Sequence, residues 1–283
     1  MYALGRYLRS LNRSVEILRA VGQISPFLKL TVEYLDLQHI RYPIDVHLDG
    51  GIRLRLEESE EVKILWNIFV RRCYPMAGDE SIVLDLGGNI GLFSLYAARE
   101  APRARIFTAE PIPSTFERLQ QHLRWNALLG RVTALNYGIA GTECDRFIAR
   151  EAVPLGQKRL LSGPDDNTAA DTRVSCRTLA SLMAEHRLET VDLAKIDIEG
   201  SEFEALLATP PEILGRIQRI ALELHNNTTA KGYRPDELLN HLKESGFEIA
   251  QMETDPEGFS QVELRQTRDQ FNVFPQRSKR AIA

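Results

Sequence analysis

Two acidic residues and a cluster of glycines are spaced in this chain as a nucleoside-binding site requires. An apolar run that begins at Ile82 reaches an acid at Asp85, and a second acid, Glu110, follows a second strand-like run. Between the two acids lie the glycines Gly87, Gly88 and Gly91. Glycines in a turn between a buried strand and a helix let the backbone approach a ligand closely. A glycine-rich first turn with an acid about 20 residues further on binds nucleosides in doubly wound α/β folds.

The spacing of the glycines separates two kinds of nucleoside ligand. A dinucleotide site has the pattern G-x-G-x-x-G, whereas this turn reads G-G-N-I-G and is one residue shorter overall. Hydride transfer with a dinucleotide would also need a substrate domain, and the sequence offers none. The shorter turn therefore fits S-adenosylmethionine better.

Each part of S-adenosylmethionine has a candidate partner in this segment. The three glycines would give close backbone approach, and amide groups at the start of the following helix would hold its carboxylate. Glu110 would accept hydrogen bonds from both ribose hydroxyls. Asp85 would either accept from the ammonium group or order the loop. In the alternative interpretation the segment is a plain strand-to-helix turn, with Asp85 capping the helix.

A second group of charged residues follows another strand-like run. Asp197 and Glu199 are two residues apart, so in an extended backbone both carboxylates would point to one face, together with Lys195. Such a pair is costly unless it is solvated, paired or used. One carboxylate could act as general base on a substrate hydroxyl, or the pair could hold a divalent cation. In the structural alternative, Glu199 orders the turn and Ser201 caps the next helix.

The next strand-like run ends in a third group. Glu223 and His225 also share parity, so we expect them to face the same cleft. A histidine can take a proton from a hydroxyl at neutral pH. The catalytic candidates are therefore Asp197, Glu199 and His225. A divalent metal would be held by Asp197, Glu199 and Glu223, although no ligand spacing demands one.

Strands and helices alternate from residue 81 onward, which predicts a mostly parallel sheet with helices on both faces. The expected strands are residues 81–86, 105–109, 132–137, 192–196, 218–224, 247–252 and 271–275; the expected helices are residues 90–100, 114–128, 202–208 and 235–245. Residues 141–178 interrupt the alternation and are expected to form an irregular or hairpin insertion. Because ligands bind beyond the carboxyl ends of parallel strands, the acids that end these strands predict an enzyme.

The segment before the sheet has a different pattern. Residues 1 to about 40 are expected to be helical with a break at Ser25-Pro26, residues 44–48 and 52–56 to form a hairpin, and residues 60–74 to form a helix. The first 20 residues mix arginines with apolar residues and lack an unbroken apolar core, so a secretory signal is not expected. A basic amphipathic helix of this kind packs on its own domain or, in the alternative, lies on a membrane surface.

Composition excludes several classes of protein. The net charge of −4 provides no basic field, so nucleic acid is not an expected partner. Three cysteines lie far apart, which suits a reduced cytoplasmic protein better than a disulfide framework or a zinc site. No apolar run is long enough to span a bilayer. These properties predict a cytoplasmic enzyme and give no indication of its oligomeric state.

Four segments of the chain together resemble the FkbM family of methyltransferases that use S-adenosylmethionine. They are Val83-Leu-Asp-Leu-Gly-Gly-Asn-Ile-Gly-Leu-Phe-Ser94, Ala109-Glu-Pro111, Leu193-Ala-Lys-Ile-Asp-Ile-Glu-Gly-Ser-Glu202 and Ala221-Leu-Glu-Leu-His225. The third segment is the most specific, and the resemblance covers roughly residues 42–275. The chain departs from the family pattern at Ala180, where an acid is common, and at Gly88, where alanine is common. We expect no chemical cost from Gly88.

The resemblance implies a Rossmann-like class I methyltransferase, with a seven-stranded sheet whose last strand is antiparallel. It implies that S-adenosylmethionine is held by Asp85, Gly87, Asn89, Gly91 and Glu110, and that Asp197 and Glu199 lie near the transferred methyl group. The expected reaction is O-methylation of a hydroxyl on a sugar or secondary metabolite. The alternative is a non-catalytic scaffold module with the same fold in a biosynthetic assembly.

The expected organisation has three parts. Residues 1–75 form a helical and hairpin extension, residues 76–276 the methyltransferase domain, and residues 277–283 a flexible tail. Acceptor specificity is expected to depend on residues 1–80 and 141–178. The acceptor would be a small molecule or glycan that carries a hydroxyl.

Overall fold

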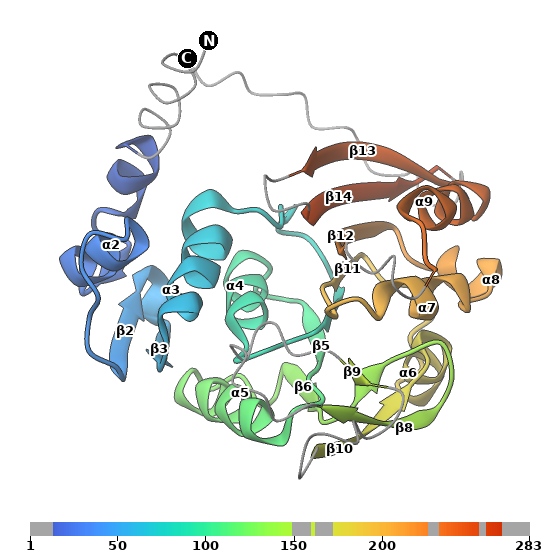
Figure 1. Cartoon of the computed structure of the whole chain (residues 1–283), viewed down its shortest axis with the longest axis horizontal. Helices are drawn as coiled ribbons and strands as arrows, with labels where there is room; N and C mark the ends of the chain where they lie inside the picture. Colours follow the sequence, from blue (N-terminus) through green and yellow to red (C-terminus); the bar gives the residue numbers. More distant parts are fainter. Residues whose placement is uncertain (1–13, 149–159, 162–171, 226–231, 255–258, 268–283) are drawn as a thin grey trace.

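A computed structural model describes residues 14–148, 160–161, 172–225, 232–254 and 259–267 of the chain (Figure 1). A seven-stranded sheet forms the centre, with strand order β13-β14-β12-β11-β4-β5-β6. Its strands are β4 (Ile82–Leu86), β5 (Arg105–Ala109), β6 (Val132–Leu135), β11 (Leu193–Ile196), β12 (Arg219–His225), β13 (Phe247–Thr254) and β14 (Phe259–Gln266). The four pairs of neighbouring strands from β12 to β6 are parallel, whereas β14 is antiparallel to both of its neighbours. The expected Rossmann-like sheet with an antiparallel last strand is confirmed.

One strand of the sheet was not predicted. The last strand of the sheet is β14, and the segment 271–275 lies outside the described residues. The sequence of β14 alternates apolar residues with glutamine, glutamate and arginine, because Val262 and Leu264 enter the core while Gln261 and Glu263 face the opposite side. Because half of its residues are polar, β14 has a weaker apolar pattern in the sequence than residues 271–275, and the apolar pattern was the basis of the strand prediction.

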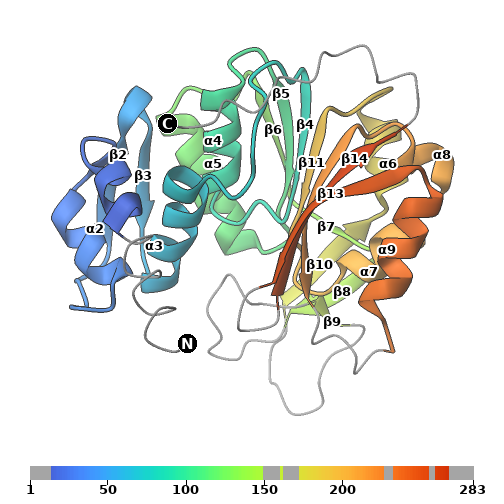
Figure 2. The ribbon, with the colours of Figure 1, turned by 90° about the horizontal axis from the view of Figure 1, so that it is seen from above.

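Helices cover both faces of the sheet (Figure 2). One face packs against α4 (Leu92–Glu100) and α5 (Pro113–Trp125), and Leu119 joins Val83 and Ile106 in one apolar core. The other face packs against α6 (Leu179–Glu185), α7 (Glu202–Leu207) and α9 (Pro235–Glu244), with the short α8 (Pro211–Leu214) beside them. Helix α6 was not predicted. It is short, and the hydroxyl of Thr178 caps it by accepting from the amide of Ser181.

The segment before the sheet extends the first of these cores. Its elements are β1 (Ile24–Ser25), α2 (Phe27–Tyr34), β2 (Ile44–Leu48), the short helix η1 (Asp49–Gly51), β3 (Arg53–Leu56), α3 (Ser59–Leu65) and the π-helical turn η2 (Trp66–Arg71). The hairpin is confirmed, with Gly50 and Gly51 in the left-handed region. Trp66 and Phe69 share the apolar core with α4, so this extension helps to hold one side of the sheet.

The described part of the insertion forms a second, smaller sheet together with residues 138–139 just before it. The strand order is β7 (Gly138–Ile139), β10 (Thr172–Arg177), β8 (Cys144–Ile148) and β9 (Leu160–Leu161). Strands β8 and β10 pair antiparallel over five residues, so the hairpin interpretation of this segment is the better one.

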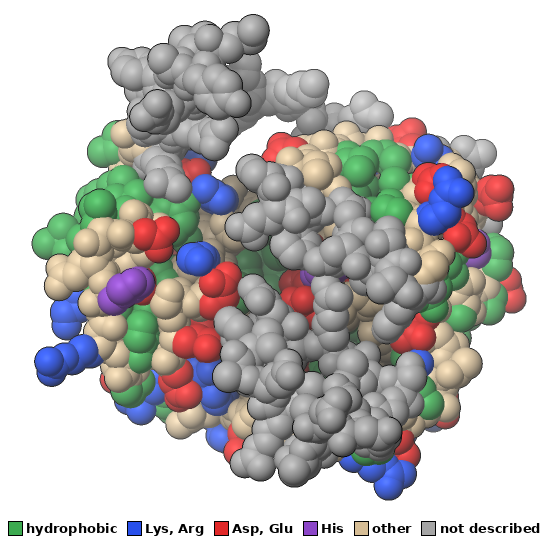
Figure 3. Space-filling model, viewed as in Figure 1, with side chains coloured by type: hydrophobic (Ala, Val, Ile, Leu, Met, Phe, Trp, Pro, Cys, Tyr) green, Lys and Arg blue, Asp and Glu red, His purple; other side chains and the backbone are tan. Residues whose placement is uncertain are grey.

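The most exposed large apolar side chains of the described residues lie in the N-terminal segment. Leu18, Leu28 and Leu37 are each more than two-thirds exposed, and Figure 3 shows hydrophobic side chains gathered over this part of the molecule. Within the described residues, no helix combines the length and the apolar character that crossing a membrane requires. Contact of the N-terminal helices with a membrane surface stays a prediction.

Candidate active site

The glycine turn lies where β4 ends, in contact with the backbone that follows β11. Gly87 has a φ of +83°, and a Cβ atom at this position would lie 1.7 Å from the carbonyl oxygen of Asp197. Asn89 and Gly91 also adopt positive φ values, of 47° and 90°. Only glycine fits at position 87, because a side chain would strain the backbone and collide with the neighbouring strand end. Gly87 therefore allows the turn to pack against the backbone of Asp197, and close approach of the turn to a ligand stays a prediction.

Gly88 corrects one expectation. A Cβ atom here would lie 2.1 Å from the hydroxyl oxygen of Thr108 and 3.0 Å from Leu119 Cδ1. Replacing Gly88 by alanine would therefore have a steric cost, because the added methyl group would collide with the side chain of Thr108 on β5. The sequence alone could not show this contact, because Thr108 lies 20 residues away in the chain.

Glu110 is buried directly after β5 and faces the glycine turn. Its Oε2 accepts from the amide of Asn89 at 2.9 Å, and its Oε1 accepts from the amide of Ile112 at 2.9 Å. Burial raises the pKa of Glu110 to about 7, although these two amides lower it. Each carboxylate oxygen can accept a second hydrogen bond. Glu110 therefore fixes the turn and keeps acceptor capacity for a diol.

Asp85 is fully buried beneath the turn. Its Oδ2 accepts from the hydroxyls of Ser94 at 2.6 Å and Thr108 at 3.2 Å, and its Oδ1 lies 3.4 Å from Lys195 Nζ. A side chain with no exposed surface orders the loop. Of the two roles expected for Asp85, the described contacts favour this one over contact with an ammonium group.

Lys195 links the turn to the end of β11. Its buried ammonium group donates to the carbonyl oxygen of Gly87 at 2.7 Å and lies 3.5 Å from Asp197 Oδ2. Burial lowers the pKa of Lys195, but the charges of Asp197, Asp85 and Glu223 outweigh that effect and raise the pKa above its ordinary value. Lys195 is therefore a permanent positive charge between the glycine turn and the carboxylates beyond it.

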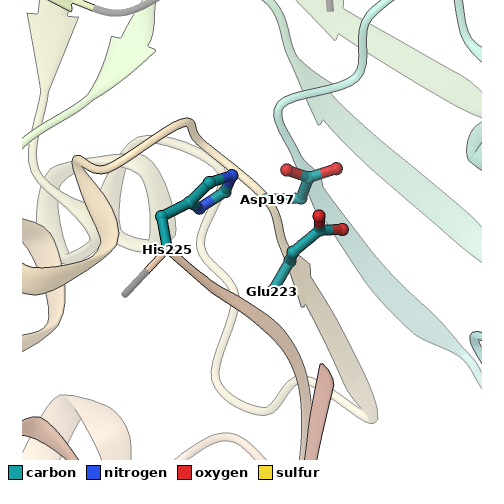
Figure 4. Close-up of side chains that lie close together, drawn as sticks. All are labelled: Asp197, Glu223 and His225. Carbon is teal, nitrogen blue, oxygen red and sulfur yellow. The ribbon is translucent and has the colours of Figure 1, made fainter. Parts of the chain in front are cut away.

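Asp197, Glu223 and His225 come together at the ends of β11 and β12. One ligating atom from each lies within 4.8 Å of the others, and Figure 4 shows the two carboxylates side by side with the imidazole ring directed toward them. The hydroxyl of Tyr74 donates to Glu223 Oε2 at 3.2 Å. The charge of Asp197, followed by burial, raises the pKa of Glu223 to about 7. This shared cleft agrees with the parity of Glu223 and His225.

Glu199 is oriented differently from the expectation. The strand ends at Ile196, and Glu199 has a φ of 53°, so its side chain does not follow the alternation of an extended strand. Its Oε2 lies 3.4 Å from His225 Nε2. Ser201 makes no side-chain cap; instead Glu202 Oε2 accepts from the amide of Gly200 at 2.7 Å.

His225 is held between two carboxylates. Its Nδ1 lies 2.9 Å from Glu202 Oε1, which also accepts from the His225 amide. Burial lowers the pKa of His225, but the hydrogen bond to Glu202 and the charges of Glu202, Glu199 and Asp197 outweigh it and raise the pKa to about 9. The imidazole therefore carries a proton at neutral pH. Glu202 and Tyr74 were missed in the sequence, since Glu202 reads as an ordinary first-turn acid and Tyr74 lies far from the motifs.

The described charges leave this edge of the sheet negative. Lys195 and His225 provide two positive charges, against the carboxylates of Asp85, Asp197, Glu199 and Glu202. A negative cleft beside a glycine turn suits a cationic nucleoside cofactor. The sheet order and the site together define a Rossmann-like class I methyltransferase.

Comparison with known proteins agrees with this class. Residues 85–249 match the family described as the methyltransferase FkbM domain, and the chain belongs to this family. It is 30% identical over 244 residues to methyltransferase sdnD of Sordaria araneosa, covering 74% of this chain and 92% of that protein. It is 26% identical over 241 residues to 31-O-demethyl-FK506 methyltransferase FkbM of Streptomyces tacrolimicus, covering 75% and 91%.

A third relative is much longer. The chain is 31% identical over 247 residues to the AMB antimetabolite synthetase AmbE of Pseudomonas aeruginosa, covering 73% of this chain. The match spans 12% of the length of AmbE.

Proposed function

We propose that this methyltransferase uses S-adenosylmethionine and transfers its methyl group to a hydroxyl oxygen of a sugar or secondary metabolite. The observation that carries the proposal is the contact between the glycine turn and the carboxylate cluster. Gly87 touches the backbone of Asp197, so a nucleoside seated on the turn lies beside Asp197 and Glu223. The family, whose relatives include an enzyme named for a 31-O-demethyl substrate, supports the same reaction.

The residues of the turn and of β5 fit the cofactor. Gly87, Gly88 and Gly91 let the turn pack against Asp197, Thr108 and Leu119, and the open end of α4 presents amide groups to the carboxylate of the amino-acid part. Glu110 accepts from the ribose hydroxyls with the lone pairs that Asn89 and Ile112 leave free. Bound S-adenosylmethionine supplies an electrophilic methyl group on a sulfonium ion. Asp85 supports the turn from below.

The proton acceptor is the carboxylate pair Asp197 and Glu223. The hydroxyl oxygen forms the new bond to the methyl carbon while the carbon–sulfur bond breaks, and the bonding electrons remain on sulfur. The hydroxyl proton passes to a carboxylate of the pair. Of the other candidates, His225 already carries a proton and Glu199 faces His225. Positioning supplies most of the acceleration, and the base contributes about 10²–10⁴-fold.

One observation supports a divalent cation at this site. Asp197, Glu223 and His225 are close enough to share an ion, a different set from the expected Asp197, Glu199 and Glu223. However, Lys195 already pairs with Asp197, and His225 Nε2 faces Glu199. These contacts already engage Asp197 and His225, and the proposed reaction gives no step to a metal.

Isothermal titration calorimetry with S-adenosylmethionine tests the proposal. The wild-type protein is expected to bind one equivalent, and Glu110→Ala is expected to bind it more weakly. The alternative, a non-catalytic scaffold, is not favoured by the family; it predicts binding without turnover on any hydroxyl acceptor. A wild-type protein that binds no S-adenosylmethionine would refute the proposed function.

A further inference from the structure

A cavity of about 500 Å³ lies beside the carboxylate cluster. One wall is the end of η2 and the segment after it, including Arg71, Arg72 and Tyr74. The floor is one face of β12, β14 and β13, on the side of the sheet opposite α9. Residues 67–75 belong to the segment expected to determine specificity, whereas the described part of the insertion does not line this cavity.

Strand register arranges the floor into two rows of side chains. Glu223 pairs with Gln261, and Gln261 pairs with Glu253, so these three form one row across the three strands. Glu263 and Gln251 form the second row, beside the small side chain of Ala221. Opposed residues of antiparallel strands share a face. Neighbouring strands lie about 4.8 Å apart, so the first row extends about 10 Å from β13 to β12.

The first row ends at the reaction centre. Glu223 lines the cavity and also lies within 4.8 Å of Asp197 and His225. Tyr74, from the opposite wall, hydrogen-bonds to the same carboxylate. A molecule in the cavity therefore has a direct approach to the groups that accept its proton.

The chemistry of the lining selects one class of acceptor. Planar carboxylate and amide groups bind pairs of neighbouring hydroxyls, and this floor presents them in alternation from Glu253 through Gln261 to Glu223. Arginine and asparagine side chains face them from the other wall. Glu253 Oε1 already accepts from Gln251 Nε2 at 2.8 Å, and Glu223 accepts from Tyr74. An apolar alcohol would take the remaining hydrogen-bonding capacity of the lining out of water without replacing it, which costs binding free energy.

We propose that this cavity is the acceptor site and that the row Glu253–Gln261–Glu223 selects a polyhydroxylated, sugar-like acceptor over an apolar alcohol. The inference rests on the proposed function, since the acceptor must meet a methyl group held at the glycine turn. Gln261 and Glu253 are the specificity-determining residues, and Glu223 connects them to the reaction.

Two sets of probes test the class of acceptor. The polyol set contains glucose, galactose, rhamnose, glucuronate and myo-inositol; the apolar set contains cyclohexanol, 1-octanol and phenol. Release of S-adenosylhomocysteine reports turnover, and saturation-transfer NMR on the full chain loaded with S-adenosylhomocysteine reports binding of each probe. We expect binding and turnover with members of the polyol set. Absence of binding by every polyol, or a preference for the apolar set, overturns the proposal.

Variants locate the site. Gln261→Leu and Glu253→Gln are expected to lower kcat/KM for the accepted polyol about tenfold or more, mainly through KM, while Kd for S-adenosylmethionine is unchanged. Gln121→Leu on α5 and Glu244→Gln on α9 are matched controls at exposed positions outside the cavity. Equal values for the cavity variants and the controls would show that the acceptor binds elsewhere. A wild-type protein that does not bind S-adenosylmethionine would instead count against the proposed function.

Discussion

Lys195 Nζ lies 2.7 Å from the carbonyl oxygen of Gly87. This single hydrogen bond joins the strand that leads to Asp197 with the turn that would hold the cofactor. The same ammonium group lies within 3.5 Å of carboxylate oxygens of both Asp85 and Asp197. One buried cation therefore fixes the relative position of the glycine turn and the carboxylate of Asp197.

Lys195→Met should damage both stability and cofactor binding. The substitution leaves the buried carboxylate of Asp85 without its cation, and breaking a buried ion pair costs about 3–5 kcal/mol. Urea denaturation measures the loss, and calorimetry measures Kd for S-adenosylmethionine. Lys63→Met is the matched control, because Lys63 forms an exposed pair with Glu60. Equal stability losses in the two variants would contradict the role given to Lys195.

Gly88→Ala should destabilise the protein by about 1–3 kcal/mol, since the added Cβ meets the Thr108 hydroxyl and Leu119. The double variant Gly88→Ala/Thr108→Ala should lose less free energy of unfolding than the sum of the losses of the two single variants, because the collision with the hydroxyl is removed. Thermal unfolding of the single and double variants gives the coupling. Gly130→Ala, where the added atom meets nothing within 4 Å, controls for the change of residue type. Strict additivity would mean that Thr108 does not determine the choice of glycine.

Affinity for S-adenosylmethionine should rise as the pH increases through about 7. The pKa of Glu110 is raised from 4.5 to about 7 by burial, and the ionised carboxylate is the better acceptor for ribose hydroxyls. Between pH 4.5 and about 7, the Glu110 side chain is ionised in the unfolded chain but keeps its proton in the folded protein. Glu110 therefore reduces the stability of the cofactor-free protein as pH rises over this range, with the full reduction reached above about pH 7.

Calorimetry between pH 6 and pH 8 checks the dependence on Glu110, with Glu110→Gln as the variant that cannot titrate. The variant should bind more weakly at pH 8 and show little change with pH. The same pH dependence in wild type and Glu110→Gln would assign the titration to another group.

Asp197→Asn and Glu223→Gln should each lower kcat by about 10²–10⁴-fold with Kd for S-adenosylmethionine largely kept. Both substitutions preserve shape and remove the group that accepts the proton. Single-turnover methyl transfer to an accepted hydroxyl compound is the measurement, with Glu244→Gln as an exposed control. If both variants kept wild-type kcat, neither carboxylate would be the base.

The strand-end acids were predictable because hydrophobic periodicity located β4, β5, β11 and β12 closely. Parallel strands bring their carboxyl ends to one edge, so Asp85, Glu110, Asp197 and Glu223 gather there whatever their separation in the chain. The resemblance to a family then identified the kind of nucleoside.

The orientation of individual side chains was not predictable. Glu199 follows a strand end, but its left-handed backbone turns it toward His225, and no pattern in the sequence fixes that φ value. Tyr74 reaches Glu223 across 149 residues of chain. The cavity depends on the register of β13 and β14, and the second of these strands was not predicted. Long-range packing determined what local periodicity could not.

A crystal structure of the protein with S-adenosylhomocysteine tests the central claim most directly. We expect the ribose hydroxyls to contact Glu110, the nucleoside to lie over the turn from Gly87 to Gly91, and the sulfur to face Asp197 and Glu223. A nucleoside bound away from the turn, or a sulfur atom directed away from both carboxylates, would contradict it.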